Sequence, residues 1–397
     1  MRMVFMDKAL GELFATDTFV NLTVNRKFFD DGSWTAQVAN VPGIVELLES
    51  AKYVKFDRGD VESTFHFNNV SETGLVEKWS YDATSASYQV SGRMAEAMLT
   101  GVTSMGLNRQ IPTRFFATAP SAPDVIIAMW EQYRVGEQRP WSLFGTSFSR
   151  VDASYNVETS VDFEIVNFSP KIYRLLETRN LGFRLATVDD WTKAGATIGR
   201  GPEFALGIIQ PRDLSSDVLL ALENGTILGY TEDIDVSDEY DAVLSQWSSE
   251  DGRYTFRALN TRDLEIKGNT QETNDKIIKA MTDNRYRTLN SINSNYTPDA
   301  SATDKEVYQA IRTNALETLG EHSTAVAVNM NVSGGSVYPS VCNLGDFVSF
   351  RNPRTGKTEK RQIVEAEEVY KEGGMAARLT LGSRQITNTQ RAINRAG

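Results

Sequence analysis

The amino-acid sequence predicts an α+β fold that is mainly β. Short segments of alternating apolar and polar residues recur along the chain, clusters of Gly, Asn and Asp separate them, and only a few stretches show apolar residues at helical spacing. The chain has 397 residues, of which 41% are hydrophobic and 23% charged, so it can form several domains with a sizeable core. We expect two small barrel-like antiparallel β domains with α/β insert domains between them.

The first barrel-like domain is expected at residues 1–101. Apolar residues alternate at Val20, Leu22 and Val24, a turn follows at residues 30–32, and the alternation returns at residues 34–38. This pattern predicts a hairpin with one buried face. Further elements are predicted as strands at 53–56, 61–67, 75–81 and 87–90, and as a short helix at 94–99.

An α/β insert is expected at residues 102–200. One helix is predicted to run from Ser121 to about Arg134. A second helix has Ser169 as its N-cap and Pro170 at its first position, with Gly182 placed for a left-handed C-terminal cap. A strand is predicted to follow at residues 183–188.

A β segment with a helical insert is expected at residues 201–322. Strands are predicted at 204–210, 218–222, 230–236, 241–246 and 254–258, and helices at 271–283 and 304–319. Asn224-Gly225 lies between two apolar runs and predicts a hairpin turn, because both residues tolerate positive φ.

The second barrel-like domain is expected at residues 323–397. Alternation at 325–331, an apolar run at 341–344, and further strand patterns at 347–350, 362–370 and 377–381 predict a small antiparallel β domain. The segment RNPRTGKT at residues 351–358 resembles a phosphate-binding loop, but it lacks the first Gly and contains a Pro. We therefore interpret it as a hairpin turn.

Composition excludes several classes of function. A formal charge of −11 and a pI near 5.0 argue against a nucleic-acid-binding surface but are compatible with a channel that DNA crosses without sticking. With one cysteine, Cys342, and two distant histidines, His66 and His322, the chain cannot form an internal disulfide or a Cys/His zinc site. The N-terminus contains no signal-peptide core or membrane span, so we expect synthesis in a cytoplasm.

Carboxylates could still support two other activities. The acidic run from Glu232 to Asp241 offers the oxygen ligands that calcium requires, although it does not fit EF-hand spacing, and alternate carboxylates on a strand usually form a solvated face. A glycosidase needs only two positioned carboxylates, whereas a nucleophilic triad is poorly supplied with bases here. We assign no catalytic, cofactor-binding or metal-ligating residue, and a weak calcium or hydrolase site stays open.

Phrases spread from about Phe19 to Leu381 carry a resemblance to a known family. The run LGFRL at 181–185, the run PRDLSSDVLLALENGTILGY at 211–230 and the step D-x-Y-D-A-V at 238–243 resemble the minor tail proteins of long-tailed actinobacteriophages. That siphophage family is similar in turn to the baseplate hub, or tail-associated protein, of long non-contractile tails.

The resemblance implies a structural, non-enzymatic baseplate hub at the tail tip of the virion. It implies a homotrimer around an axial channel, with two barrels per subunit forming a pseudo-sixfold ring. It also implies contacts with the distal tail protein, the tape-measure protein and tail-tip or fibre proteins, gating of DNA ejection, only indirect contact with the host cell surface and no cofactor. A tail-associated cell-wall hydrolase and a carbohydrate-binding receptor module are the alternative functions.

Overall fold

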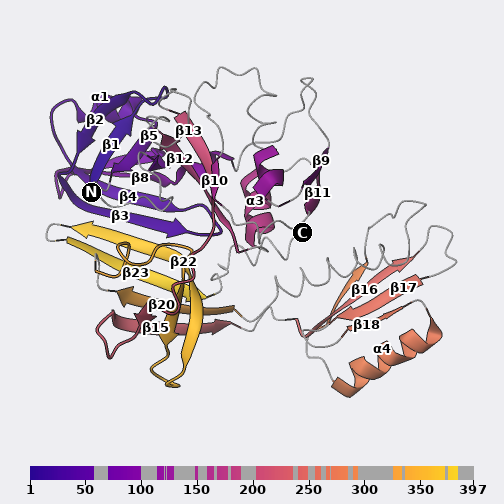
Figure 1. Cartoon of the computed structure of the whole chain (residues 1–397). Coiled ribbons are helices and arrows are strands. Elements are labelled where there is room, and N and C mark those ends of the chain that lie inside the picture. Colours follow the sequence, from indigo (N-terminus) through magenta and orange to yellow (C-terminus); the bar gives the residue numbers. More distant parts are fainter. Residues whose placement is uncertain are drawn as a thin grey trace. The chain divides into compact units, whose positions relative to one another are not determined.

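The computed structural model describes most of the chain. The described residues are 1–57, 70–99, 114–119, 121, 123–128, 148–150, 159–164, 168–177, 180–188, 203–235, 240–248, 255–260, 265–268, 270–284, 289–293, 325–332, 336–371 and 374–382. Contacts divide them into two compact units (Figure 1). Unit 1 joins Met1–Glu232 to Ala327–Arg384, and unit 2 contains Asp233–Val326. The boundaries of the four expected domains stay a prediction.

A seven-stranded sheet in unit 1 has the order β10-β13-β12-β6-β5-β1-β2. Its strands are β1 (Arg2–Met6), β2 (Glu12–Thr16), β5 (Tyr53–Asp57), β6 (Val70–Leu75), β10 (Phe148–Arg150), β12 (Gly182–Val188) and β13 (Glu203–Ile209). All its pairs are antiparallel except β10 with β13. The predicted strands at 53–56, 183–188 and 204–210 are confirmed.

A ten-stranded sheet follows the path β15-β20-β23-β22-β3-β4-β8-β7, with β21 attached to β22 and β14 to β21. Its strands are β3 (Phe19–Lys27), β4 (Ser33–Ala39), β7 (Lys78–Asp82), β8 (Ser87–Arg93), β14 (Leu219–Leu220), β15 (Ile227–Asp235), β20 (Ala325–Val332), β21 (Phe347–Arg351), β22 (Thr358–Lys371) and β23 (Gly374–Gly382). Strand β22 pairs with β23 on one side and β3 on the other, which joins the two ends of the chain.

The expected barrels are replaced by open sheets: within the described residues, neither large sheet closes on itself. The reason is the β3–β22 pairing, which merges strands expected in two separate barrels into one continuous sheet. The antiparallel, mainly β character of the prediction is confirmed. Residues 341–344 form turns rather than the expected continuation of the strand pattern.

The first predicted hairpin is confirmed as β3 and β4, with one difference at its start. Leu22 and Val24 are buried as expected, whereas 58% of Val20 is exposed. The register shifts between Phe19 and Asn21, so Val20 occupies a bulge and leaves the alternation. Simple period-two counting could not anticipate this extra residue.

Helix α3 (Phe168–Glu177) confirms the helix predicted to start at Ser169, but both of its ends differ from the expectation. Ser169 lies inside the helix rather than at the N-cap. At the other end Asn180, not Gly182, adopts the left-handed conformation with φ 53°, and Leu181 N–H donates to Leu176 O at 3.0 Å. Gly182 instead begins β12.

Apolar residues cover both faces of the seven-stranded sheet. On one face Val4 and Phe183 pack with Ile172 of α3 and with Leu99 of the 3-10 helix η1 (Ala95–Leu99). On the other face the alternate β1 residues and β5 pack against β3, β4 and α1 (Ile44–Ser50), around Trp34. A third cluster fills the C-terminal part of the ten-stranded sheet. The seven-stranded sheet is thus the middle layer of this part of unit 1.

Two smaller sheets complete the described structure. In unit 1, β9 (Arg114–Ala119) pairs antiparallel with β11 (Thr159–Glu164), and residues 123–128 are helical. Unit 2 holds the sheet β18-β17-β16-β19, with α4 (Gln271–Asn284) packed on it through Ile277. The strands are β16 (Ala242–Ser248), β17 (Thr255–Asn260), β18 (Glu265–Gly268) and β19 (Leu289–Asn293). This confirms the helix predicted at 271–283.

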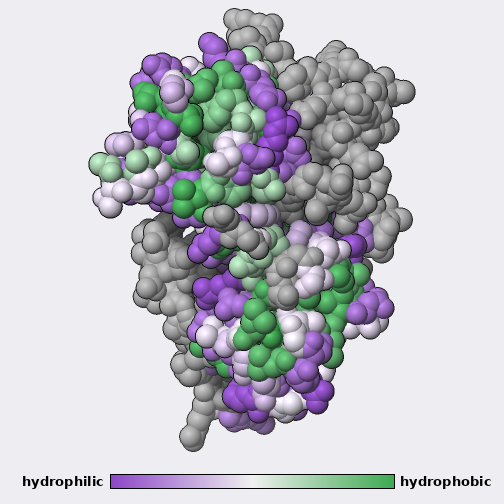
Figure 2. All heavy atoms as spheres, turned by 90° about the vertical axis from the view of Figure 1, so that its left-hand side faces the viewer, coloured by the Kyte–Doolittle hydropathy of each residue, from purple (hydrophilic) through white to green (hydrophobic). Residues whose placement is uncertain are grey.

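Some predicted elements lie outside the described residues: the strand at 61–67, the helix at 304–319 and the later part of the helix from Ser121. His66 and His322 lie outside them as well. In the part of the chain that is described, no helix has the length and apolar content of a membrane span. On the face of the molecule in Figure 2, hydrophobic residues gather in an upper and a lower area.

Candidate functional site

A fully buried ionic cluster joins the two large sheets of unit 1. Arg26 on β3 donates from Nε to Glu72 Oε2 on β6 at 2.6 Å and forms an ion pair with Glu368 on β22. Tyr370 donates its hydroxyl to Glu368 Oε2 at 2.5 Å. Arg26, Glu72 and Glu368 are 1%, 6% and 0% exposed. One guanidinium thus holds two carboxylates away from water.

Electrostatics keep Arg26 charged. Burial alone would lower the pKa of Arg26, but the carboxylates of Glu368 and Glu72 raise it well above its usual value. The buried carboxylates of Glu72 and Glu368 need a positively charged partner, and Arg26 is that partner. Removal of any one of the three groups would leave a buried charge without compensation. The cluster links β6 of the seven-stranded sheet to β3 and β22 of the ten-stranded sheet.

A second buried polar cluster lies where η1 meets β12 and the end of β3. Glu96 Oε1 accepts the Leu185 N–H at 3.2 Å and lies 3.7 Å from Arg184 Nε. Arg184 also donates to the carbonyl of Lys27 at 2.5 Å. Burial raises the pKa of Glu96 to about 7, and Arg184 offsets only part of that effect. The carboxyl group is therefore poised to gain or lose its proton near neutral pH.

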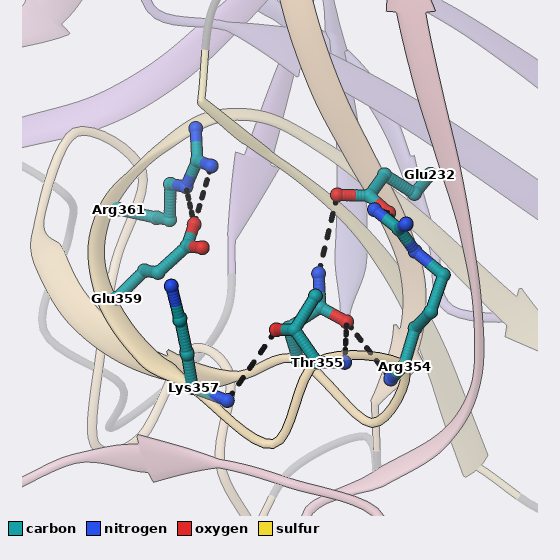
Figure 3. A network of polar contacts seen from close by, with 7 residues as sticks. Glu232, Arg354, Thr355, Lys357, Glu359 and Arg361 are labelled. Carbon is teal, nitrogen blue, oxygen red and sulfur yellow. Dashed lines mark hydrogen bonds and ion pairs between the residues drawn. The ribbon is translucent and has the colours of Figure 1, made fainter.

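The hairpin between β21 and β22 is the third polar site, and it confirms the turn predicted for RNPRTGKT (Figure 3). Asn352 Oδ1 accepts the N–H groups of Arg354 and Thr355 at 2.9 and 3.3 Å, and Asn352 Nδ2 donates to Glu232 Oε1 at 3.2 Å. Gly356 adopts φ 69°, as a tight turn requires. The loop amides are engaged within the turn and do not form a phosphate cradle.

Acidic residues compensate the basic residues around this hairpin. Figure 3 shows Glu232 beside Arg354 and Glu359 beside Arg361. Arg354 Nη2 lies 3.0 Å from Glu232 Oε2. Lys360 Nζ lies 2.6 Å from Asp213 Oδ2. Its hydrogen bond, with that of Ser215, lowers the pKa of Asp213 to about 2. The Lys360–Asp213 pair holds the segment before β15 against β22, and the Arg354–Glu232 pair joins the hairpin turn to β15. Together the three pairs leave little net positive charge to attract an anion.

The remaining sequence candidates show a structural role where the structure describes them. Cys342 is buried, and this burial raises the pKa of its thiol to about 12, which makes it a poor nucleophile. Glu232 of the acidic run pairs with Arg354. Among the described residues, no three His, Cys, Asp or Glu side chains lie close enough together to hold a metal ion.

Sequence reasoning missed the buried charges, although the pattern contains a signal for two of them. Arg26 has the same strand parity as Leu22 and Val24, and Glu368 has the same parity as Ala366. A charged residue at an inward position of an alternating strand indicates a buried ion pair. No comparable local signal marks Glu96, because it lies in a short 3-10 helix.

The comparisons with known proteins are structural. No protein-family model matches the sequence, and no curated protein matches it. A tail protein from Neisseria meningitidis MC58 is similar with a TM-score of 0.52 at 10% identity, over 96% of each chain. The 43 kDa tail protein of prophage MuSo2 from Shewanella oneidensis has a TM-score of 0.49 at 12% identity, over 96% of this chain and 98% of its own. Prophage tail protein gp18 from Listeria monocytogenes has a TM-score of 0.47 at 14% identity, over the whole of both chains.

At these identities the likeness defines the fold alone. The Neisseria protein carries that conclusion, because it has the highest TM-score of the three, 0.52, and its match extends over 96% of each chain. The chain therefore has the fold of the Neisseria tail protein, in agreement with the tail-protein resemblance in its sequence. The actinobacteriophage family itself stays a prediction.

Proposed function

We propose that this chain is a structural baseplate hub at the tip of a phage tail. The observation that carries the proposal is the fold shared with the Neisseria tail protein along 96% of each chain. The sequence resemblance to the minor tail proteins of siphophages supports the same role.

The proposed hub is a homotrimeric ring around the axial channel of the tail. Its partners would be the distal tail protein, the tape-measure protein and the tail-tip or fibre proteins, and its position would be the tail tip of the virion. Phage DNA would cross the ring during ejection without specific binding. The net charge of −11 and the compensated basic residues of the β21–β22 hairpin favour such weak contact.

Electron microscopy of the purified protein, classified without imposed symmetry, tests the proposal. We expect a threefold ring with a central hole. Single compact subunits at high protein concentration, together with single subunits in the presence of the distal tail protein, would overturn the hub assignment. Labelling of this chain in intact virions then tests its position, since the proposal requires the label at the tail tip only.

We propose further that the role is mechanical rather than enzymatic. The buried carboxylates Glu72 and Glu368 share one guanidinium, which suits joining of sheets and not general acid–base chemistry. The protein should therefore release no fragments from host cell walls and retain no host glycans. Wall degradation that is lost on changing one exposed Asp or Glu would favour the hydrolase, and saturable glycan binding would favour the receptor module.

A further inference from the structure

The 3-10 helix η1 lies where the pairing of two strands in the seven-stranded sheet ends. Strand β12 pairs with β6 only as far as Ala186. The N–H of the next residue of β12, Leu185, donates instead to Glu96 Oε1 in η1, at 3.2 Å. Strand β6 in turn forms a single antiparallel bridge from Gly74 to Met94, the residue before η1. Helix η1 thus contacts both strands, and a carboxyl oxygen replaces a strand as the acceptor of a backbone N–H.

The surroundings of Glu96 suit a neutral carboxyl group better than a carboxylate. Glu96 is 2% exposed, so its charge would have almost no contact with water. Arg184 Nε lies 3.7 Å from Glu96 Oε1, which is beyond hydrogen-bond distance. The terminal nitrogens of Arg184 donate to two backbone carbonyls instead, Phe183 O at 2.9 Å and Lys27 O at 2.5 Å. The guanidinium therefore compensates the carboxyl group only in part.

The other elements around η1 add no cation beside this carboxyl group. Their titratable groups near it are Tyr173 from α3, Asp30 and Asp31 from the turn after β3, and Glu72 from β6. The Tyr173 hydroxyl donates to Asp31 Oδ1 at 3.2 Å, and Arg26 compensates the charge of Glu72. Burial raises the pKa of the Glu96 carboxyl group to about 7, Arg184 lowers this pKa by less, and Asp31 raises it further.

We propose that the Glu96 carboxyl group is a proton-operated latch, which holds η1 between β6 and β12 when it is protonated and releases η1 when the proton is lost. Release lets the carboxylate reach water and frees the Leu185 N–H. Because Leu99 of η1 packs in the same apolar cluster as Ile172, release also loosens the contact between η1 and α3. The latch lies within unit 1 of one chain, so it does not depend on the proposed ring.

Release of η1 should become more frequent as pH rises. In the released segment the carboxyl group has its ordinary pKa of 4.5, whereas in the closed site the pKa is raised to about 7. Between these two values release is accompanied by loss of a proton, so the open fraction grows with pH and levels off above pH 7. From pH 6 to pH 8 this linkage gives an increase of about tenfold in the open fraction.

Hydrogen–deuterium exchange of the full-length protein tests the latch, because exchange of a buried amide reports how often its surroundings open. The Leu185 N–H is the amide that the Glu96 carboxyl group protects. After correction for the intrinsic pH dependence of exchange, its open fraction should rise about tenfold from pH 6 to pH 8. It should also exceed the open fraction of amides in β23, a core strand of the same unit, and should not respond to low concentrations of denaturant, because release of η1 exposes little surface.

Two variants assign the effect to Glu96. Glu96→Gln keeps an acceptor for the Leu185 N–H but has no proton to lose near neutral pH, so the open fraction at Leu185 should be equal at pH 6 and pH 8. Asp31→Asn is the matched control, because it removes a neighbouring carboxylate and leaves the latch in place. It should keep the rise, which should level off at a lower pH than in wild type because Asp31 raises the pKa of Glu96.

Three results would overturn the latch. The first is an open fraction at Leu185 that is the same at pH 6 and pH 8 in wild type. The second is a rise that persists in Glu96→Gln, since another group would then cause it. The third is an equal open fraction at Leu185 and in β23, which would show that η1 is released only when unit 1 unfolds. If Glu96→Gln does not fold, the wild-type and Asp31→Asn profiles decide alone. None of these measurements depends on the trimer, so the latch and the proposed hub succeed or fail separately.

Discussion

Arg26 Nη2 on β3 lies 2.5 Å from Glu72 Oε2 on β6, and this contact joins the two large sheets of unit 1 in a site from which water is excluded. Glu368 on β22 binds the same guanidinium from the C-terminal part of the chain. A single side chain therefore connects a strand of the seven-stranded sheet to two neighbouring strands of the ten-stranded sheet.

Replacement of Arg26 by Met should strongly destabilise the fold. The change would leave two carboxylates buried without their cation, which typically costs about 3–5 kcal/mol. Chemical denaturation of unit 1 would measure the free energy of unfolding. The triple variant Arg26→Met, Glu72→Gln, Glu368→Gln also removes the two unpaired carboxylate charges. It should therefore recover most of the lost free energy of unfolding. A single variant within about 1 kcal/mol of wild type would contradict this account.

Two glycines flank the ring of Phe28, and their replacement by Ala should reveal two separate costs. A Cβ at Gly182 or Gly345 would come within 2.5 or 2.3 Å of Phe28 Cε2. Gly345 also has φ 95°, whereas Gly225 has φ 72° with nothing within 4 Å of its Cβ position. Gly182→Ala should therefore cost about 1–3 kcal/mol from overpacking, Gly225→Ala about 1–2 kcal/mol from backbone strain, and Gly345→Ala more than either.

A second substitution at Phe28 separates these costs. Phe28→Leu shortens the side chain and should relieve much of the Gly182→Ala defect in the double variant, but only part of the Gly345→Ala defect. Thermal unfolding of the four variants and the two doubles would measure this. Equal rescue of both glycine variants would refute the assignment of backbone strain to Gly345.

Asn352 should matter more to the β21–β22 hairpin than the ion pair beside it. Asn352 is 2% exposed and makes hydrogen bonds to two loop amides and to Glu232. Asn352→Ala leaves these groups without their partner, at about 1–3 kcal/mol. Arg354→Ala removes a cation whose side chain is 64% exposed and should cost about 0–1 kcal/mol. Denaturant unfolding of both variants measures how much stability each one loses. A larger loss for Arg354→Ala than for Asn352→Ala would contradict this interpretation of the hairpin.

The thiol of Cys342 should be unreactive in the folded protein. Its side chain is buried and its pKa is raised to about 12, so almost no thiolate forms at pH 8. An aromatic disulfide reagent releases a coloured thiolate when it reacts with a cysteine. Its absorbance should indicate no reactive thiol before denaturant is added and one thiol per chain afterwards. Rapid reaction with one thiol per native chain would show that the segment around Cys342 opens readily.

Local pattern predicted most of the described strands because their alternation reports which face is buried. Leu22 and Val24 on β3 illustrate this. Strand β12 was predicted instead from a short apolar run, and it is buried along its described length. It also predicted helix α4 and the turn at Gly356. The bulge at Val20 and the left-handed cap at Asn180 were not predicted, because both depend on how neighbouring segments pair and pack.

Pairing across the chain could not be predicted, and the buried clusters depend on it. Lys27 and Glu365 are partners in the β3–β22 ladder, far apart in sequence, and this contact turns two expected barrels into one open sheet. Arg26 meets Glu368 because β22 pairs with β3. The sequence pattern shows that Arg26 on β3 and Glu368 on β22 occupy inward positions. It does not show which residues they contact.

Glu96 should make the stability of unit 1 depend on pH. Folding raises the pKa of its carboxyl group from 4.5 to about 7, because burial disfavours the charge. The folded chain therefore binds more protons than the unfolded chain between these values, and the free energy of unfolding contributed by this group falls as pH rises through the window. Glu96→Gln, which keeps an acceptor for the Leu185 N–H, should remove this slope.

The comparison of wild type and Glu96→Gln by denaturant unfolding from pH 4.5 to pH 8 measures the effect. The two proteins should have similar stability at the acidic end, where Glu96 is neutral, and the variant should be more stable by about 1–3 kcal/mol at pH 8. The groups that face Glu96 are Arg184 on β12, Tyr173 on α3 and Asp31 in the turn after β3. Asp31→Asn serves as the matched control, because it removes a nearby charge without changing the buried carboxyl group. A variant less stable than wild type at pH 8 would show instead that the Arg184 contact outweighs the burial of the charge.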